Sequence, residues 1–214
     1  MVPPAIRMIE RRVAELMFAH LCHELIGPVT AINNGFELVE AGEPVPEDVR
    51  DLLVRSAKTG SQRLRFYRIA YGWLADDASF GIEDARVLLD EFLDGGKVAL
   101  RWLNVARLGP IGARLLLNAV ALGAETLPRG GTVTADIRNA HTTELALVCI
   151  GDGARISEEC IRAIAPDVDV AGLTPRSVHA YFARRFAEAH GGTLRISAAA
   201  PGKVEFVVTM PNGA

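Results

Sequence analysis

Two long stretches with helical periodicity, separated by a short proline-rich segment, constrain the fold of this chain most strongly. From about Ala5 to Glu40, apolar residues recur every three or four positions, which predicts one amphipathic helix. The segment AGEPVPED follows, and its glycine and prolines end one helix and allow another to begin. A second apolar stripe, from about Glu47 to Leu74, predicts a second helix, so the two form an antiparallel hairpin.

The hairpin alone leaves apolar surface uncovered. Each helix buries one face against the other, and the rest of each stripe needs a further partner. We expect the hairpins of two chains to combine into a dimeric four-helix bundle. The alternative is that the hairpin folds back on the rest of its own chain.

Beyond residue 78 the pattern changes to helices interleaved with strands. Helices are expected at 83–93, 111–127, 157–165 and 176–190, and strands at 97–103, 131–139, 143–151, 192–198 and 204–210. This combination predicts an α/β sandwich of about 130 residues, a usual size for one domain. The chain therefore divides into a helical domain of residues 1–78 and an α/β domain of residues 79–214.

Composition excludes several classes of protein. Half of the 214 residues are hydrophobic and the net charge is −3, so a disordered chain and a nucleic-acid-binding protein are both excluded. No run of about 18 apolar residues occurs, so we expect no membrane contact, no signal peptide and a cytoplasmic location. The three cysteines lack metal-binding spacing, and their odd number gives no disulfide framework. Reduced thiols are expected.

The most informative polar residue of the first helix is His23. Helical residues advance by about 100°, so His23 lies about 200° from both Leu21 and Leu25 and points away from the apolar stripe. Gly27, one turn later, weakens the helix by up to about 1 kcal/mol relative to alanine. Pro28 predicts a kink. His23 is therefore expected on a bent, exposed ridge, where a simple solvated histidine is the alternative interpretation.

The segment FAHLCHELIGPVTAI resembles the phosphoacceptor motif of sensor histidine kinases, in which a phosphorylatable His precedes an acidic residue and, five places on, a proline. The resemblance implies that His23 is the phosphoacceptor and that the hairpin is a dimerisation and phosphotransfer domain. A neutral imidazole, with a reference pKa of about 6.5, can attack phosphorus through one nitrogen while a hydrogen bond holds the other. Glu24 is expected to hold that second nitrogen, although it can equally serve only to solvate the helix.

Residues 83–211 resemble the ATP-binding (Bergerat or GHKL-type) domain of histidine kinases, but the nucleotide motifs depart from the family pattern. Asn118 matches the first asparagine of the family's Asn helix, while Leu122 stands where the second would ligate Mg²⁺, and leucine offers no oxygen. The segment GDGARISEE fails to supply the family's Asp-x-Gly-x-Gly in either register. The region between Gly172 and Gly191 has no glycine for a phosphate-binding loop. We therefore expect a kinase-like α/β sandwich that does not bind ATP.

The two halves together resemble the ChpT family of histidine phosphotransferases over nearly the whole chain. This resemblance implies a two-component phosphorelay. His23 would accept phosphoryl from the receiver domain of a hybrid histidine kinase and pass it to the receiver aspartate of a response regulator. The chain would need no cofactor or metal of its own, because the receiver supplies the Mg²⁺. The alternatives are an ATP-dependent histidine kinase with a divergent nucleotide site and a noncatalytic dimer that binds a receiver.

The surface that contacts the receiver is expected around His23. On the first helix it would comprise Ala19, His20, Ile26, Gly27 and Thr30. A hairpin that turns near residue 43 brings residue 63 opposite His23, which would place three arginines within reach of a phosphohistidine or an acidic receiver rim: Arg63, Arg65 and Arg68. A solvated basic face explains these arginines equally well. His141, His179 and His190 receive no role.

Gly27 also bears on whether the protein has phosphatase activity. Many kinases of this type have Thr or Asn four residues after the phosphoacceptor, where the side chain orients a water against the phosphorylated receiver. Glycine has no side chain for this task. The protein is therefore expected to move phosphoryl groups but to add little phosphatase activity.

Overall fold

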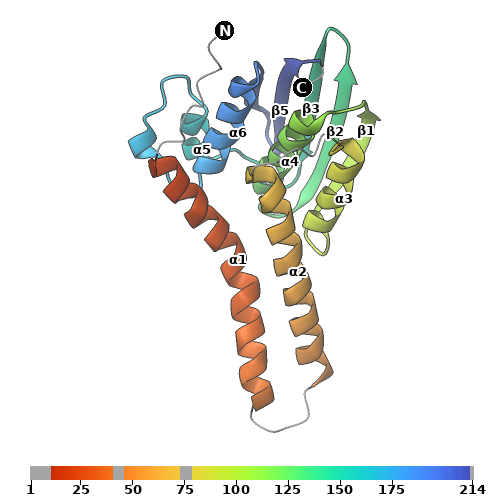
Figure 1. Cartoon of the computed structure of the whole chain (residues 1–214), viewed down its shortest axis with the longest axis vertical. Helices are drawn as coiled ribbons and strands as arrows, with labels where there is room; N and C mark the ends of the chain where they lie inside the picture. The colour runs from red at the N-terminus through yellow and green to blue at the C-terminus, as the bar shows by residue number, and fades with distance from the viewer. Residues whose placement is uncertain (1–10, 41–45, 73–78, 213–214) are drawn as a thin grey trace.

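A helical hairpin projects from a two-layer α/β domain in the computed structural model of this chain, which describes residues 11–40, 46–72 and 79–212 (Figure 1). The expected combination of a helical part with a helix-and-sheet part is confirmed. None of the described helices combines the length and the apolar character needed to cross a membrane.

The hairpin consists of α1 (Arg11–Glu40) and α2 (Glu47–Tyr71), which run antiparallel (Figure 1). The expected ends at Ala5 and Leu74 lie outside the described residues. Helix α1 continues through Pro28, and its N-terminal half leans away from the line of its C-terminal half, as expected for a proline kink. Lower down the hairpin, Gly35 allows close packing, since a Cβ there would lie 2.6 Å from the Leu53 side chain of α2.

The α/β domain contains every helix and strand that the sequence predicts, with ends shifted by at most a few residues. Its helices are α3 (Ile82–Leu93), α4 (Pro110–Glu125), α5 (Glu158–Ala163) and α6 (Val178–Ala189), and a short 3-10 helix, η1 (Val170–Gly172), was not foreseen. Its strands are β1 (Val98–Val105), β2 (Gly131–Asn139), β3 (Thr142–Ile150), β4 (Thr193–Ala200) and β5 (Lys203–Pro211). They form one sheet in the order β1-β2-β3-β5-β4, in which β1 and β2 are parallel and the other neighbours antiparallel.

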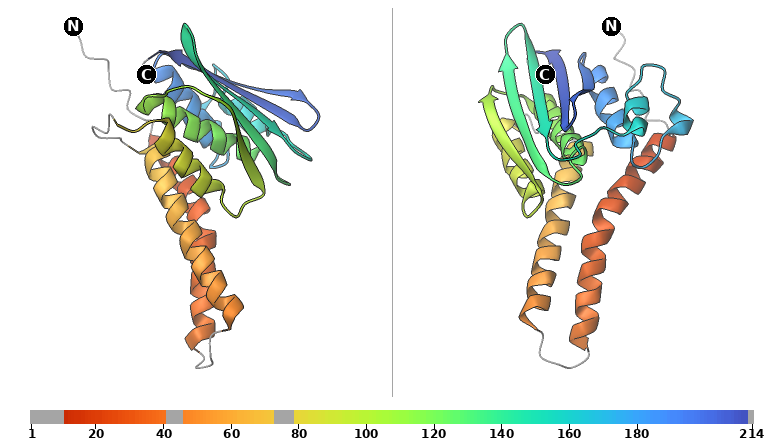
Figure 2. Two further views of the ribbon diagram at one scale, coloured as in Figure 1. Left: turned by 90° about the vertical axis from the view of Figure 1, so that its right-hand side faces the viewer. Right: turned by 180° about the vertical axis from the view of Figure 1, so that it is seen from behind.

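The core lies between one face of this sheet and helices α3, α4 and α6 (Figure 2). Alternate residues of the central strands point into it, as the period of two in a strand requires; in β2 these are Val133, Ala135 and Ile137. Helix α4 is buried along most of its length, because it contacts the sheet on one side and α2, α3 and α6 on others. Its nearly uniform apolar sequence follows from this central position.

The hairpin packs against its own α/β domain at one end. The C-terminal part of α2 contacts α3 and α4, where Phe66 and Ala70 are fully buried, and the N-terminal part of α1 contacts α6. In this half of the hairpin the apolar stripes are thus covered by the chain's own α/β domain, which was the alternative to dimerisation. The half near the hairpin turn keeps exposed apolar side chains, including Val29 and Phe36 of α1 and Val54 of α2. The dimeric bundle stays a prediction.

Candidate functional site

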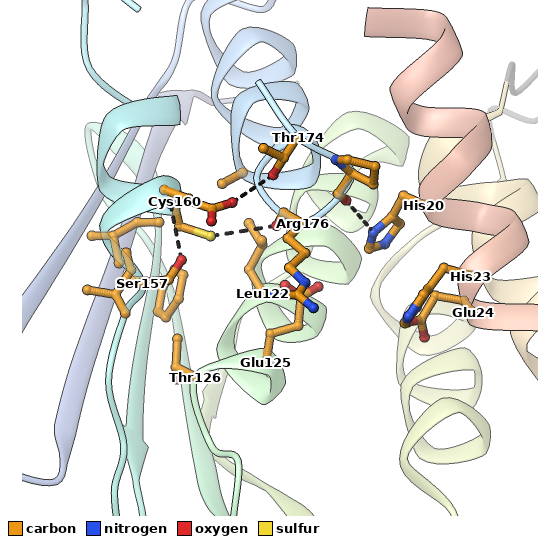
Figure 3. A pocket seen from close by; sticks show the side chains of 16 residues that line it. His20, His23, Glu24, Leu122, Glu125, Thr126, Ser157, Cys160, Thr174 and Arg176 are labelled. Carbon is orange, nitrogen blue, oxygen red and sulfur yellow. Dashed lines mark hydrogen bonds and ion pairs between the residues drawn. The ribbon is translucent and has the colours of Figure 1, made fainter. Parts of the chain in front are cut away.

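A cleft of about 620 Å³ separates α1 from the α/β domain (Figure 3). Helix α1 contributes His20, His23 and Glu24, and α4 contributes Leu122 and Glu125 from the opposite side. The cleft therefore joins the expected phosphoacceptor to the region that corresponds to the nucleotide site of a kinase.

The side chain of His23 is 79% exposed, in agreement with the ridge position predicted from the helical period. Its Nδ1 lies 3.6 Å from Glu24 Oε1, which is too long for a hydrogen bond. The imidazole is thus available to a docking protein, with a carboxylate near one of its nitrogens.

Glu24 is engaged across the hairpin. Its Oε2 accepts a short hydrogen bond from Nη1 of Arg63 on α2, and the Arg63 guanidinium also lies 5.9 Å from the ring centroid of Phe92. The expected hydrogen bond from Glu24 to the His23 ring is not present, because the planar guanidinium offers this carboxylate a stronger, charge-assisted partner. The carboxylate therefore links α1 to α2 one residue after His23.

The three arginines expected within reach of a phosphohistidine do not share one face of α2. Arg65 pairs with Glu91 of α3, at 2.9 Å, and Arg68 is exposed. The reason is the helical period: residues two apart point about 200° from each other, so Arg63 and Arg65 face different sides. Of the three, Arg63 is the one that lies beside Glu24.

The predicted contact face of α1 is only partly accessible. Ile26, Gly27 and Thr30 are exposed and fall three, four and seven residues after His23, so they share its face. His20 departs from the expectation, since it is only 7% exposed and its Nδ1 lies 3.0 Å from the carbonyl oxygen of Pro175. Ala19 is half-buried. The accessible face begins at His23 and runs toward Thr30.

Burial also changes the chemistry of His20. Its ring packs edge-on against Tyr67, with centroids 5.9 Å apart, and loss of solvent lowers the pKa of His20, so the neutral imidazole is favoured. No local sequence pattern indicates this burial, because Pro175, whose carbonyl oxygen faces His20, lies 155 residues further along the chain.

Asn118, the one asparagine that matched the kinase pattern, is fully buried and bonded within the protein. Its Nδ2 donates to the carbonyl oxygens of Ala70, at 3.1 Å, and Arg114, at 2.8 Å. Its Oδ1 lies 3.1 Å from Nε2 of His179. Asn118 thus connects the end of α2 with α4 and α6.

A hairpin that presents an exposed histidine, joined to a kinase-like α/β sandwich, defines a phosphotransfer protein of two-component signalling. Residues 82–202 match the family model described as the histidine phosphotransferase C-terminal domain. The chain belongs to this family, which confirms the resemblance seen in the sequence. It is a protein histidine phosphotransferase of a phosphorelay.

Individual relatives agree with this assignment. Protein phosphotransferase ChpT of Brucella abortus (strain 2308) is 31% identical over 189 residues, which are 86% of this chain and 90% of the relative. A solved structure described as a bacterial phosphotransferase is 27% identical, with a TM-score of 0.79 over 95% of this chain and 98% of that one. The histidine kinase ThkA in complex with response regulator protein TrrA shares the fold, with a TM-score of 0.54 and 16% identity over 94% of this chain and 64% of that one.

Proposed function

We propose that this protein relays phosphoryl groups between receiver domains through a phosphohistidine at His23. In the first step a nitrogen of His23 attacks the aspartyl phosphate of a hybrid kinase's receiver; a P–N bond forms as the P–O bond to the aspartate breaks. In the second step the aspartate of a response regulator attacks the phosphohistidine and the P–N bond breaks. The supporting observation is the exposed imidazole of His23, at the start of an accessible helix face.

The protein's own contribution to this transfer is positioning. The Mg²⁺ of the receiver neutralises charge on the transferring group, so the chain must mainly hold an unprotonated nitrogen in line with phosphorus. The ion pair between Glu24 of α1 and Arg63 of α2 joins the two helices beside His23. A receiver that docks along His23, Ile26, Gly27 and Thr30 would place its aspartate over the ring. Receivers of this kind act in the cytoplasm, where we therefore place the protein.

We further propose that the transfer is independent of ATP. Leu122 lines the cleft where a kinase would present a magnesium ligand, and the amide of Asn118 is already bonded to Ala70, Arg114 and His179. Leu122 thus offers no oxygen to a metal ion, and the amide of Asn118 is engaged in joining α2, α4 and α6.

The relay is tested by mixing the purified protein with a phosphorylated receiver. We expect acid-labile, base-stable label on the wild type, none on His23→Ala, and transfer of that label to a second receiver. Labelled ATP and Mg²⁺ alone should give no phosphohistidine; label on His23 without a partner kinase would establish an ATP-dependent kinase instead. If His23→Ala still produces the full cellular output, the protein acts only by binding receivers.

A homodimer is the second part of the proposal. Val29 and Phe36 lie seven residues apart on one face of α1 and are 52% and 55% exposed, so a second hairpin would cover them. Light scattering should give about 46 kDa, twice the 23.0 kDa of one chain, and Phe36→Glu should reduce this mass to that of a monomer. Leu38→Glu, about 200° away around the helix, is the matched control. A wild-type mass near 23 kDa across the micromolar range would refute the dimer.

A further inference from the structure

Three side chains that the relay does not use meet where α1 joins the α/β domain. They are His20 of α1, Glu125 of α4 and His179 of α6, and one nitrogen or oxygen atom from each lies within 4.8 Å of the other two. His179 is fully buried and His20 is 7% exposed, while the Glu125 side chain is 40% exposed. Both Glu125 and His20 line the cleft, so the group is reachable from it (Figure 3).

The hydrogen bonds of Asn118 determine where the proton of His179 sits. The Asn118 amide nitrogen donates to two carbonyl oxygens, so its Oδ1 is the atom that faces His179 Nε2. Because this oxygen can only accept a hydrogen bond, Nε2 of His179 must carry the proton and donate it. In the neutral ring, Nδ1 of His179 then carries a lone pair. This Nδ1 lies 3.0 Å from Oε1 of Glu125, which is also a hydrogen-bond acceptor. Two acceptors this close require a positive charge between or beside them.

His20 presents a third lone pair at the same place. Its Nδ1 must donate to the carbonyl of Pro175, which can only accept, so Nε2 is left unprotonated. Within the described part of the chain this buried Nε2 has no hydrogen-bond partner, and an unpaired buried acceptor is destabilising. A proton shared by His179 and Glu125 would leave Nε2 of His20 unpaired. A single cation placed among the three atoms would satisfy all of them.

We propose that Nε2 of His20, Nδ1 of His179 and Oε1 of Glu125 bind a divalent transition-metal ion such as Zn²⁺, with a fourth position open to the cleft. Two imidazoles and one carboxylate are the donor set of three-ligand zinc sites. The opposite nitrogen of each ring is held by a backbone carbonyl or a side-chain amide, as is usual for metal-binding histidines. Tetrahedral coordination needs ligand atoms about 3.3 Å apart. Nδ1 of His179 and Oε1 of Glu125 lie 3.0 Å apart and all three atoms lie within 4.8 Å of one another, so binding would need only a small adjustment of the side chains.

The bound ion would connect α1, α4 and α6 three residues before His23. One turn of α1 separates this point from the phosphoacceptor, so the ion would hold the base of the accessible face against the α/β domain. The three ligands lie far apart in the sequence, so no local motif predicts the site. The inference does not depend on the relay and can fail or succeed without it.

Zn²⁺ titration of the untagged full-length protein tests the proposal. The experiment uses a Cys22→Ser/Cys160→Ser background, because these two thiols are not fully buried and could bind zinc themselves. We expect one saturable site per chain, and Co²⁺ should give the visible spectrum of a tetrahedral nitrogen-oxygen site. Glu125→Gln and His20→Gln should each lower the affinity at least about tenfold, since even loss of an outer-shell partner costs about 10- to 100-fold. His141→Ala, which removes an exposed histidine elsewhere, should leave the affinity unchanged.

Folding of the variants is checked by thermal unfolding. Zn²⁺ should raise the unfolding temperature of the parent and of His141→Ala, and should raise that of Glu125→Gln much less. Two results would overturn the proposal. One is the lack of saturable one-to-one binding by a folded parent; the other is equal affinity in the parent and in Glu125→Gln. An NMR spectrum with protons on both nitrogens of His179 in saturating Zn²⁺ would assign the charge to a proton and also overturn it.

Discussion

Glu24 pairs with Arg63 across the hairpin, while Nδ1 of its neighbour His23 lies 3.6 Å from Oε1 of the same carboxylate. Both side chains of the pair are less than one-third exposed, so their attraction is screened less than that of a fully exposed pair. The pair holds α1 and α2 in register at the point where phosphoryl is expected to arrive.

A double-mutant cycle measures this link. Unfolding free energies of Glu24→Gln, Arg63→Gln and the double variant should show a coupling of about 0.5–1 kcal/mol, the upper range for partly exposed pairs. The transfer rate from a receiver to His23 should fall on the order of tenfold in Arg63→Gln, because small misplacements of reacting groups are costly. The pair of Lys58 and Asp94, with side chains 60% and 52% exposed, is the control and should show a weaker coupling. Equal couplings in both pairs would contradict a special role for Glu24.

Two glycines of α1 should respond in opposite ways to alanine. Among the described atoms, nothing lies within 4 Å of a Cβ built on Gly27, so Gly27→Ala should raise the unfolding free energy by up to about 1 kcal/mol through helix propensity. A Cβ on Gly35 would lie 2.6 Å from the Leu53 side chain, so Gly35→Ala should lower it by about 1–3 kcal/mol through overpacking. Urea unfolding of both variants gives the comparison. A stabilised Gly35→Ala would show that the helices can separate at no cost.

The sequence predicted the elements better than it predicted the site. Strands such as 131–139 were evident because alternate residues face the core, and this pattern is local. His23 could be singled out as a candidate because the residues of its motif are contiguous in the sequence. The meeting of Glu125 with His179 was not, since these residues are 54 apart and approach only once α4 and α6 pack on the sheet. The burial of His20 depends in the same way on a distant loop.

The three free cysteines should differ in reactivity, because the thiolate is the reactive form. Burial raises the pKa of Cys149 to about 11, so at pH 8 about one-thousandth of this thiol is ionised, and the fraction grows about tenfold per pH unit. Burial also raises the pKa of Cys160. With iodoacetamide at pH 8 we expect rapid labelling of exposed Cys22, slower labelling of Cys160, and labelling of Cys149 only after unfolding. Mass spectrometry identifies the sites, and loss of the rapid phase in Cys22→Ser is the control. Rapid labelling of Cys149 in the folded protein would contradict its burial.

Loss of phosphoryl from a receiver to water should be slow in the presence of this protein. Gly27 lies one turn after His23 on the same exposed face, and a side chain built there meets open space among the described residues. Hydrolysis of a receiver's aspartyl phosphate needs a water oriented for in-line attack, and loss of an orienting group costs on the order of a hundredfold in comparable sites. We therefore expect the wild type to remove phosphoryl from an excess of phosphorylated receiver only as far as His23 accepts it, with little release of free phosphate.

Gly27→Thr supplies the missing hydroxyl and should accelerate phosphate release, whereas Gly27→Ala adds the same backbone restriction without the hydroxyl and should not. Both variants are measured with and without His23→Ala, so that hydrolysis is separated from transfer to the histidine. The receiver alone gives the intrinsic rate. If wild type or His23→Ala already accelerates phosphate release well above that rate, another residue orients the water. In that case the protein ends the signal itself instead of returning the phosphoryl group to its donor.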